Sequence, residues 1–219
     1  YLKPADRGIY EHYDTIASQV EIPIILYNIP QCTGLPLPWQ MVEDLAQIPN
    51  IVGVKDSSGQ LSFILAVLEK VRDKINVLCG HDEVVLAGLA AGCSGAILAS
   101  ANVIPDVWVQ MYNHVKNGEL RQAQELQYKV QKIARIIAGS GAVGTKEALN
   151  MMKIKVGQAR MPLSVGGELT YESREELRLD LEKIGKIQPK PVTFEFEEKR
   201  IEERFTAIDV TPEIIRDFS

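Results

Sequence analysis

The sequence has no long apolar run, no block of basic residues and no regular cysteine spacing. No stretch reaches the roughly 18 apolar residues of a membrane helix and no signal peptide opens the chain, so we expect no membrane partner. The 24 Lys and Arg residues are outnumbered by 29 Asp and Glu, which argues against a nucleic-acid partner. Three cysteines without framework spacing predict free thiols in a reducing compartment, the cytoplasm.

Metal-binding motifs are missing as well. Cys32, Cys79 and His81 could meet only through tertiary folding, and no CxxC-type spacing supports a site, so we predict no metal. No Met opens the chain, from which we expect a processed, trimmed or truncated protein. With 46% hydrophobic residues in 219, the chain can build one sizeable core.

Short apolar segments alternate with segments of helical periodicity in the first half of the chain. This alternation is typical of βα units around a parallel sheet, and we predict an α/β fold with four such units in residues 1–118. The predicted strands are residues 22–28, 50–56, 75–80 and 95–100. The predicted helices are residues 7–20, 38–47, 60–74, 82–92 and 105–118.

The second half of the chain reads differently. Helical periodicity at 119–138, 142–157 and 171–186 predicts a C-terminal three-helix region at 119–187. Residues 188–219 form a charged C-terminal extension that begins with strand-like alternation and ends in a short helix capped by Thr211. The charges of this extension are explained either by a solvated face or by a segment that binds a partner.

One lysine stands at the end of an apolar strand. In "NIVGVKDSSG", strand periodicity directs Gly53 and Lys55 to the same side, and Tyr27 holds the equivalent place one strand earlier. Adjacent parallel strands then bring Tyr27 and Lys55 close together. An amine in an apolar site becomes a nucleophile for carbonyl carbon, and a phenol can carry protons. The alternative is a lysine that only reaches solvent beside a tyrosine that only packs.

The order of several motifs resembles one enzyme family. "YLKP", "PIILYNIP", "GVKDSSG", "CGHDE" and "SGAILASANV" are similar to the dihydrodipicolinate synthase / N-acetylneuraminate lyase family over residues 1–187. The resemblance implies a (β/α)8 TIM barrel and pyruvate-dependent class I aldolase chemistry without a cofactor. It also implies pyruvate and an aldehyde or 2-keto acid as substrates, and a homo-oligomer, either dimer or tetramer.

The resemblance assigns roles to individual residues. Lys55 matches the Schiff-base lysine and Tyr27 the proton-transferring tyrosine, and Tyr1 matches a second tyrosine that reaches a neighbouring subunit's site. Ile97 matches the residue whose carbonyl faces the keto acid, and Gly80 a pocket glycine.

Two departures from the family pattern matter, and the first bears on the substrate. Cys32 stands where the synthase subgroup has a carboxylate-binding arginine, which makes aspartate semialdehyde doubtful. Gly80, Asp82 and Glu83 are similar to the polyol-binding pattern of the lyase branch, although two acids at a helix N-terminus also favour the dipole. We therefore expect a lyase for a 2-keto-3-deoxy acid. The alternative within the same chemistry is 4-hydroxy-tetrahydrodipicolinate synthase.

The second departure is the absence of the first four βα units of the barrel. The keto-acid carboxylate pocket of the family lies on an early strand, so we expect this chain to hold the second half of a barrel without that pocket. An alternative of another class is a non-catalytic half-barrel that binds a partner, with Lys55 as a relic.

Overall fold

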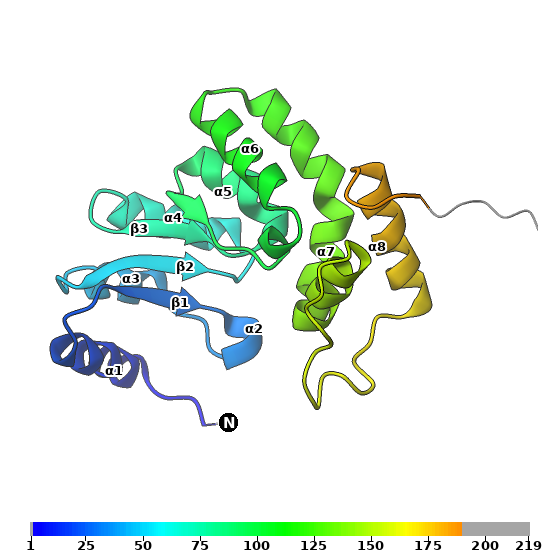
Figure 1. Ribbon diagram of the computed structural model, residues 1–219. Coiled ribbons are helices and arrows are strands. Elements are labelled where there is room, and N and C mark those ends of the chain that lie inside the picture. The colour runs from blue at the N-terminus through cyan, green and yellow to red at the C-terminus, as the bar shows by residue number, and fades with distance from the viewer. Residues whose placement is uncertain (1, 190–219) are drawn as a thin grey trace, which may run out of the picture. The chain divides into compact units, whose positions relative to one another are not determined.

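Four parallel strands form the centre of the fold (Figure 1). The computed structural model describes residues 2–189. Within this range the strand order is β1-β2-β3-β4, so β1 and β4 are the two edge strands, as the chain order predicts. The strands are β1 (Ile24–Asn28), β2 (Ile51–Asp56), β3 (Asn76–Cys79) and β4 (Gly95–Ala96).

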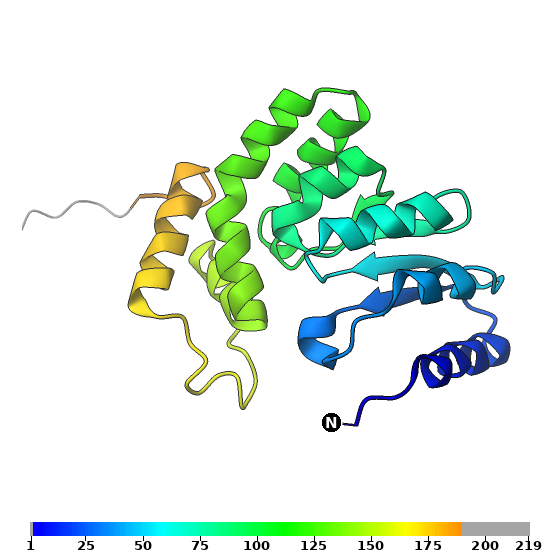
Figure 2. The same cartoon turned by 180° about the vertical axis from the view of Figure 1, so that it is seen from behind.

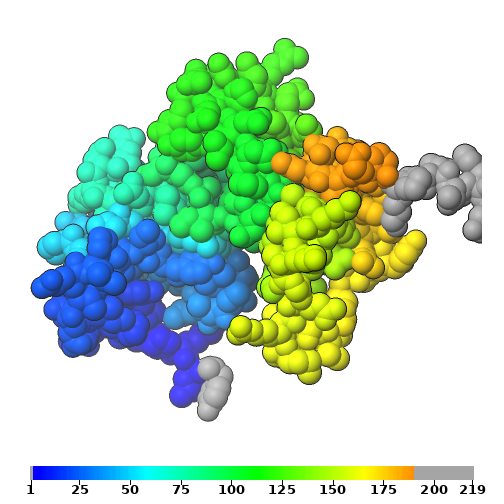
Figure 3. Space-filling view, in the orientation of Figure 1, coloured from blue at the N-terminus to red at the C-terminus, as the bar shows by residue number. Residues whose placement is uncertain are grey.

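Helices follow the strands and cover one face of the sheet. α3, α4 and α5 lie behind the strands in Figure 1 and in front of them in Figure 2. α1 lies at the surface in Figure 3, and only Ile9 and Ala17 of this helix are buried. The helices of this part are α1 (Asp6–Gln19), α3 (Trp39–Leu45), α4 (Leu61–Val71), α5 (Val85–Ala91) and α6 (Pro105–Lys116).

The two faces of the sheet differ in burial. Leu26, Val54 and Val77 point to the helices and are at most 1% exposed. On the opposite face Ile25 and Tyr27 are 47% and 42% exposed. Alternate residues of a strand face opposite sides, so this contrast follows directly from the pleat. The residues expected around Lys55 therefore lie on the less covered face.

Two connections at the carboxyl ends of the strands differ from the prediction. The loop after β1 contains a short helix, α2 (Pro30–Thr33), which is not among the predicted helices; proline is tolerated at the first helical position. The strand predicted at 95–100 ends at Ala96. The backbone N–H and the hydroxyl of Ser100 donate to Asp82, and a 3-10 turn, η2 (Ser100–Asn102), begins there.

The C-terminal region contains α7 (Leu120–Met151) and α8 (Tyr171–Lys183). The predicted break between 138 and 142 falls at Gly141, which interrupts α7 with φ 56° and ψ −128°. The end predicted at 157 is wrong, because Lys153 adopts a φ of 64° directly after the helix.

α7 packs between α6 and α8 (Figure 1), and its residues Ile133 and Ile137 are buried. Residues 1–187 form one unit, so the helices belong with the sheet, and the extension from 190 onward lies outside the described residues. Within residues 2–189, no helix has both the length and the apolar character needed to cross a bilayer.

Candidate active site

Lys55 and Tyr27 lie side by side at the carboxyl end of the sheet. Their Cα atoms are register partners on β2 and β1. The Lys55 Nζ lies 4.1 Å from the centroid of the Tyr27 ring, a cation–π arrangement. The predicted proximity of the two side chains is thus confirmed. In this arrangement the amine can attack a carbonyl carbon, and the phenol can move a proton.

Gly80 leaves the space that the Lys55 side chain occupies. A Cβ placed on Gly80 would lie 2.7 Å from Lys55 Cε and 2.9 Å from the Asp56 carbonyl oxygen. Real Cβ atoms do not approach other atoms this closely, so only glycine fits here. The sequence prediction placed Gly80 in the pocket, and the structure places it against the lysine.

Ser57 connects the phenol to the backbone. Its hydroxyl lies 3.4 Å from the Tyr27 hydroxyl and donates to the Gly80 carbonyl oxygen at 3.0 Å. Ser57 is only 4% exposed. Sequence reasoning did not single it out, although its place two residues after Lys55 was a usable signal.

A buried polar pair holds the two strand ends together on the opposite face. Asn28 Nδ2 donates to Asp56 Oδ1 at 2.6 Å, and Ser58 Oγ donates to Asp56 Oδ2 at 2.8 Å. Asn28 Oδ1 also accepts from the Leu37 N–H at 3.0 Å. Burial raises the pKa of the Asp56 carboxyl above its ordinary 3.8, while the hydrogen bonds from Ser58 and Asn28 lower it. The pair fixes Tyr27 and Lys55, which immediately precede its members.

Cys32 and Ile97 lie at the same end of the sheet. Cys32 is an exposed free thiol on α2, and its neighbour Gln31 donates to the Ser57 carbonyl oxygen at 2.8 Å. Ile97 follows β4, is 47% exposed, and its N–H donates to the Cys79 carbonyl oxygen at 2.9 Å. α2 therefore approaches the Lys55 region through Gln31.

Comparison with known proteins identifies the family of the chain. The model of the dihydrodipicolinate synthetase family matches residues 1–184. The chain belongs to the dihydrodipicolinate synthetase family. A 4-hydroxy-tetrahydrodipicolinate synthase of Methanothrix thermoacetophila is 34% identical over 189 residues, which cover 85% of this chain and 63% of the relative.

Solved structures of the family agree with this placement. A dihydrodipicolinate synthase from Acinetobacter baumannii complexed with pyruvate has a TM-score of 0.79 and 34% identity, covering 85% of this chain and 64% of that one. A monomeric dihydrodipicolinate synthase variant has a TM-score of 0.79 and 26% identity, covering 85% and 63%. The chain therefore spans less than two thirds of the length of these relatives.

Asp82 is buried in the interior of the protein. It is 3% exposed, and its carboxylate accepts from Ser100, whose hydroxyl in turn accepts from Trp108 Nε1 at 2.9 Å. Burial raises the pKa of the Asp82 carboxyl, while the hydrogen bonds from Ser100 lower it. These contacts give Asp82 a structural role, and its predicted contact with substrate stays a prediction.

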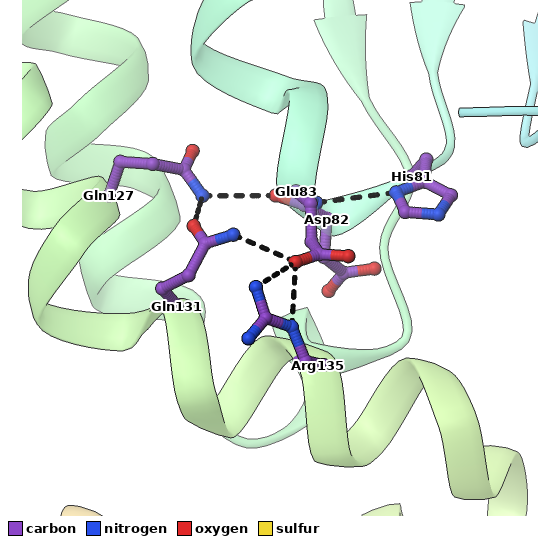
Figure 4. A network of polar contacts seen from close by, with 6 residues as sticks. All are labelled: His81, Asp82, Glu83, Gln127, Gln131 and Arg135. Carbon is purple, nitrogen blue, oxygen red and sulfur yellow. Dashed lines mark hydrogen bonds and ion pairs between the residues drawn. The ribbon is translucent and has the colours of Figure 1, made fainter. Parts of the chain in front are cut away.

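Glu83 points to α7 (Figure 4). Its carboxylate pairs with Arg135 at 2.6 Å and accepts from Gln131 at 2.9 Å, and the hydrogen bond from Arg135 lowers the pKa of this carboxyl. Sequence reasoning missed Arg135 and Gln131, because no local pattern links residues about fifty positions apart.

The remaining predictions concern Tyr1, metals and thiols. Tyr1 lies outside the described residues. Within the described part of the chain, no three His, Cys, Asp or Glu side chains are grouped so as to hold a metal ion. Burial raises the pKa of the Cys79 thiol to about 11 and that of Cys93 to about 12, which keeps both thiols protonated at neutral pH.

Proposed function

We propose that the protein is a class I, pyruvate-dependent aldolase or lyase that makes or breaks a C–C bond between pyruvate and an aldehyde. The observation that carries this proposal is the Lys55 amine 4.1 Å from the centre of the Tyr27 ring, at the carboxyl end of a parallel sheet. In α/β barrels this end of the strands holds the active site. Family membership supports the same chemistry.

The reaction begins with the Lys55 amine in its neutral form. It adds to the C2 carbonyl of a 2-keto acid, and loss of one water gives an imine. In the cleavage direction the C3–C4 bond breaks, its electron pair moves into the imine as an enamine, and the C4 hydroxyl loses its proton as the aldehyde leaves. Tyr27 carries the protons, with its hydroxyl oriented by Ser57. Protonation of the enamine at C3 and addition of water then release pyruvate and the free amine.

The substrate we propose is a 2-keto-3-deoxy sugar acid or a related hydroxy-keto acid. Cys32 offers a thiol where a guanidinium would hold a second carboxylate, which disfavours aspartate semialdehyde. Glu83 supplies a partly exposed carboxylate near the same strand ends, and carboxylate oxygens accept hydrogen bonds from hydroxyl groups.

The second candidate is 4-hydroxy-tetrahydrodipicolinate synthase, which would join pyruvate to aspartate semialdehyde. The names of the curated relatives favour it, because eight of them that are 33–36% identical carry this name. The position of Cys32 weighs against it.

We further propose that residues 1–118 are the second half of a (β/α)8 barrel, followed by the helical region 119–187 and the extension 188–219. Two observations support this: β1 and β4 are edge strands among the described residues, and Ile25 and Tyr27 are 47% and 42% exposed on one sheet face. A closed barrel would cover that face and pair both edges. The expected assembly is a homo-oligomer, dimer or tetramer.

The proposal is tested by measuring pyruvate release from a panel of 2-keto-3-deoxy acids by the full-length gene product. Lys55→Arg keeps the charge but cannot form the imine, so it should abolish release. Efficient condensation of pyruvate with aspartate semialdehyde would favour the second candidate function. Equal activity of the parent protein and Lys55→Arg would refute the imine mechanism.

A further inference from the structure

The segment after β3 is fastened to α7 through one oxygen of Glu83. Oε1 accepts from Gln131 Nε2 at 2.9 Å, from Arg135 Nε at 2.9 Å and from Arg135 Nη2 at 2.6 Å (Figure 4). Within the described residues Oε2 accepts no hydrogen bond, and the Glu83 side chain keeps 31% exposure. One oxygen is thus fixed by three donors, while the other stays available.

The backbone of the same segment is held too. Gln127 Nε2 donates to the Asp82 carbonyl oxygen at 3.2 Å and to Gln131 Oε1 at 2.8 Å, so the Gln131 amide that donates to Glu83 is itself oriented. The Glu83 N–H donates to His81 Nδ1 at 3.4 Å. Contacts from α7 therefore reach both the main chain and the carboxylate of this segment.

The segment that carries Glu83 follows β3 at the same edge of the sheet as Lys55. Gly80, three residues before Glu83, lies directly against the Lys55 side chain. The carboxyl ends of neighbouring parallel strands meet at one edge, so the segment 80–83 and Lys55 border the same space.

We propose that Arg135 and Gln131 are positioning residues that set the substrate preference of the site. By holding Glu83 Oε1 they direct Oε2 to accept a hydrogen bond from a hydroxyl of the substrate, so that α7 selects hydroxylated over unhydroxylated 2-keto acids. This inference rests on the proposed aldolase function.

A purely structural ion pair is the competing explanation, and it makes a different prediction. Arg135 is 66% exposed, and exposed ion pairs contribute little to stability, so Arg135 variants should fold. A structural pair predicts at most a small, substrate-independent change, whereas a positioning role predicts a change in the ratio between two substrates. A hydrogen bond to a charged group corresponds to a factor of about ten or more in affinity.

The test traps the imine at Lys55 with borohydride and measures the half-saturating concentration of three 2-keto acids. Pyruvate reports on imine formation alone, and 2-keto-3-deoxygluconate and 2-oxohexanoate are hydroxylated and unhydroxylated acids of equal chain length. The parent should prefer the hydroxylated acid about tenfold. Arg135→Met should remove most of this preference without changing the value for pyruvate, and Arg135→Lys should restore part of it.

Two further variants decide whether Arg135 acts through Glu83. On a Glu83→Gln background, Arg135→Met should cause no further loss of preference. Arg121→Met removes an exposed arginine from the same helix and should leave the preference unchanged. A preference in Arg135→Met equal to that of the parent, or no preference in the parent, would overturn the inference while the aldolase proposal stands. Failure to trap pyruvate on the parent protein would contradict both the positioning role and the proposed aldolase function.

Discussion

At the scale of single residues, the site depends on what stands immediately beside Lys55. The lysine lies over the Tyr27 ring, Gly80 leaves room for its stem, and Ser57 lies within 3.4 Å of the phenol hydroxyl. Together these contacts join the carboxyl ends of β1, β2 and β3. The geometry therefore depends on the register of three strands rather than on one flexible loop.

Tyr27→Phe should slow turnover far more than it weakens the fold. It removes one hydroxyl that is partly exposed and contacts Ser57, so its cost in folding free energy should stay at about 0.5–1.5 kcal/mol. Loss of positioned proton transfer lowers rates by about 10²–10⁴-fold. Steady-state kinetics together with urea unfolding measure both quantities. Parent-like turnover in Tyr27→Phe would show that the phenol only packs.

Asp56 should give the stability a pH dependence whose sign follows from the direction of its pKa shift. Burial raises the pKa of its carboxyl above the ordinary 3.8, so the folded state binds the proton more tightly than the unfolded state. Its contribution to the unfolding free energy is therefore complete below about pH 3.8, the ordinary pKa of the carboxyl. This contribution decreases as the pH rises through the pKa of Asp56 in the folded state. The unfolding free energy of the parent minus that of Asp56→Asn should fall as the pH rises above about 4. A difference that rises over this range would contradict the assignment.

At the scale of elements, the strands and the outer helices were predictable because their burial is periodic. Tyr27 and Lys55 were expected to meet, and they do, since register follows from parallel pairing. The shortness of β4 and the contact between Glu83 and Arg135 were not predictable. Both depend on side chains that meet only after the helices have packed, such as Ser100 with Asp82.

Two glycines of α7 should respond oppositely to alanine. Gly141 has a φ of 56°, which disfavours alanine, while Gly139 has no positive φ, and neither has an atom within 4 Å of an added Cβ. Gly141→Ala should destabilise the protein by about 1 kcal/mol or more, and Gly139→Ala should stabilise it by about 0.5–1 kcal/mol. Thermal unfolding of the two variants measures the contrast. Equal effects would argue against the break in α7.

At the scale of the whole molecule, the exposed sheet face should control self-association. Ile25 is 47% exposed on the face that the helices leave open, and Leu65 is 48% exposed on α4. If the 219-residue chain associates through that face, Ile25→Lys should shift it toward the monomer and Leu65→Lys should not. Sedimentation velocity over a range of protein concentrations measures the association of the parent, Ile25→Lys and Leu65→Lys. A parent that stays monomeric at all concentrations would contradict the proposed association.

The central claim is that Lys55 forms the imine, and mapping the trapped adduct tests it most directly. The full-length protein is treated with pyruvate and borohydride, digested and analysed by peptide mass spectrometry, with Lys55→Arg treated in parallel. The proposed mechanism predicts one pyruvate-derived adduct on Lys55 and none in Lys55→Arg. Labelling of other lysines while Lys55 remains unmodified would contradict it.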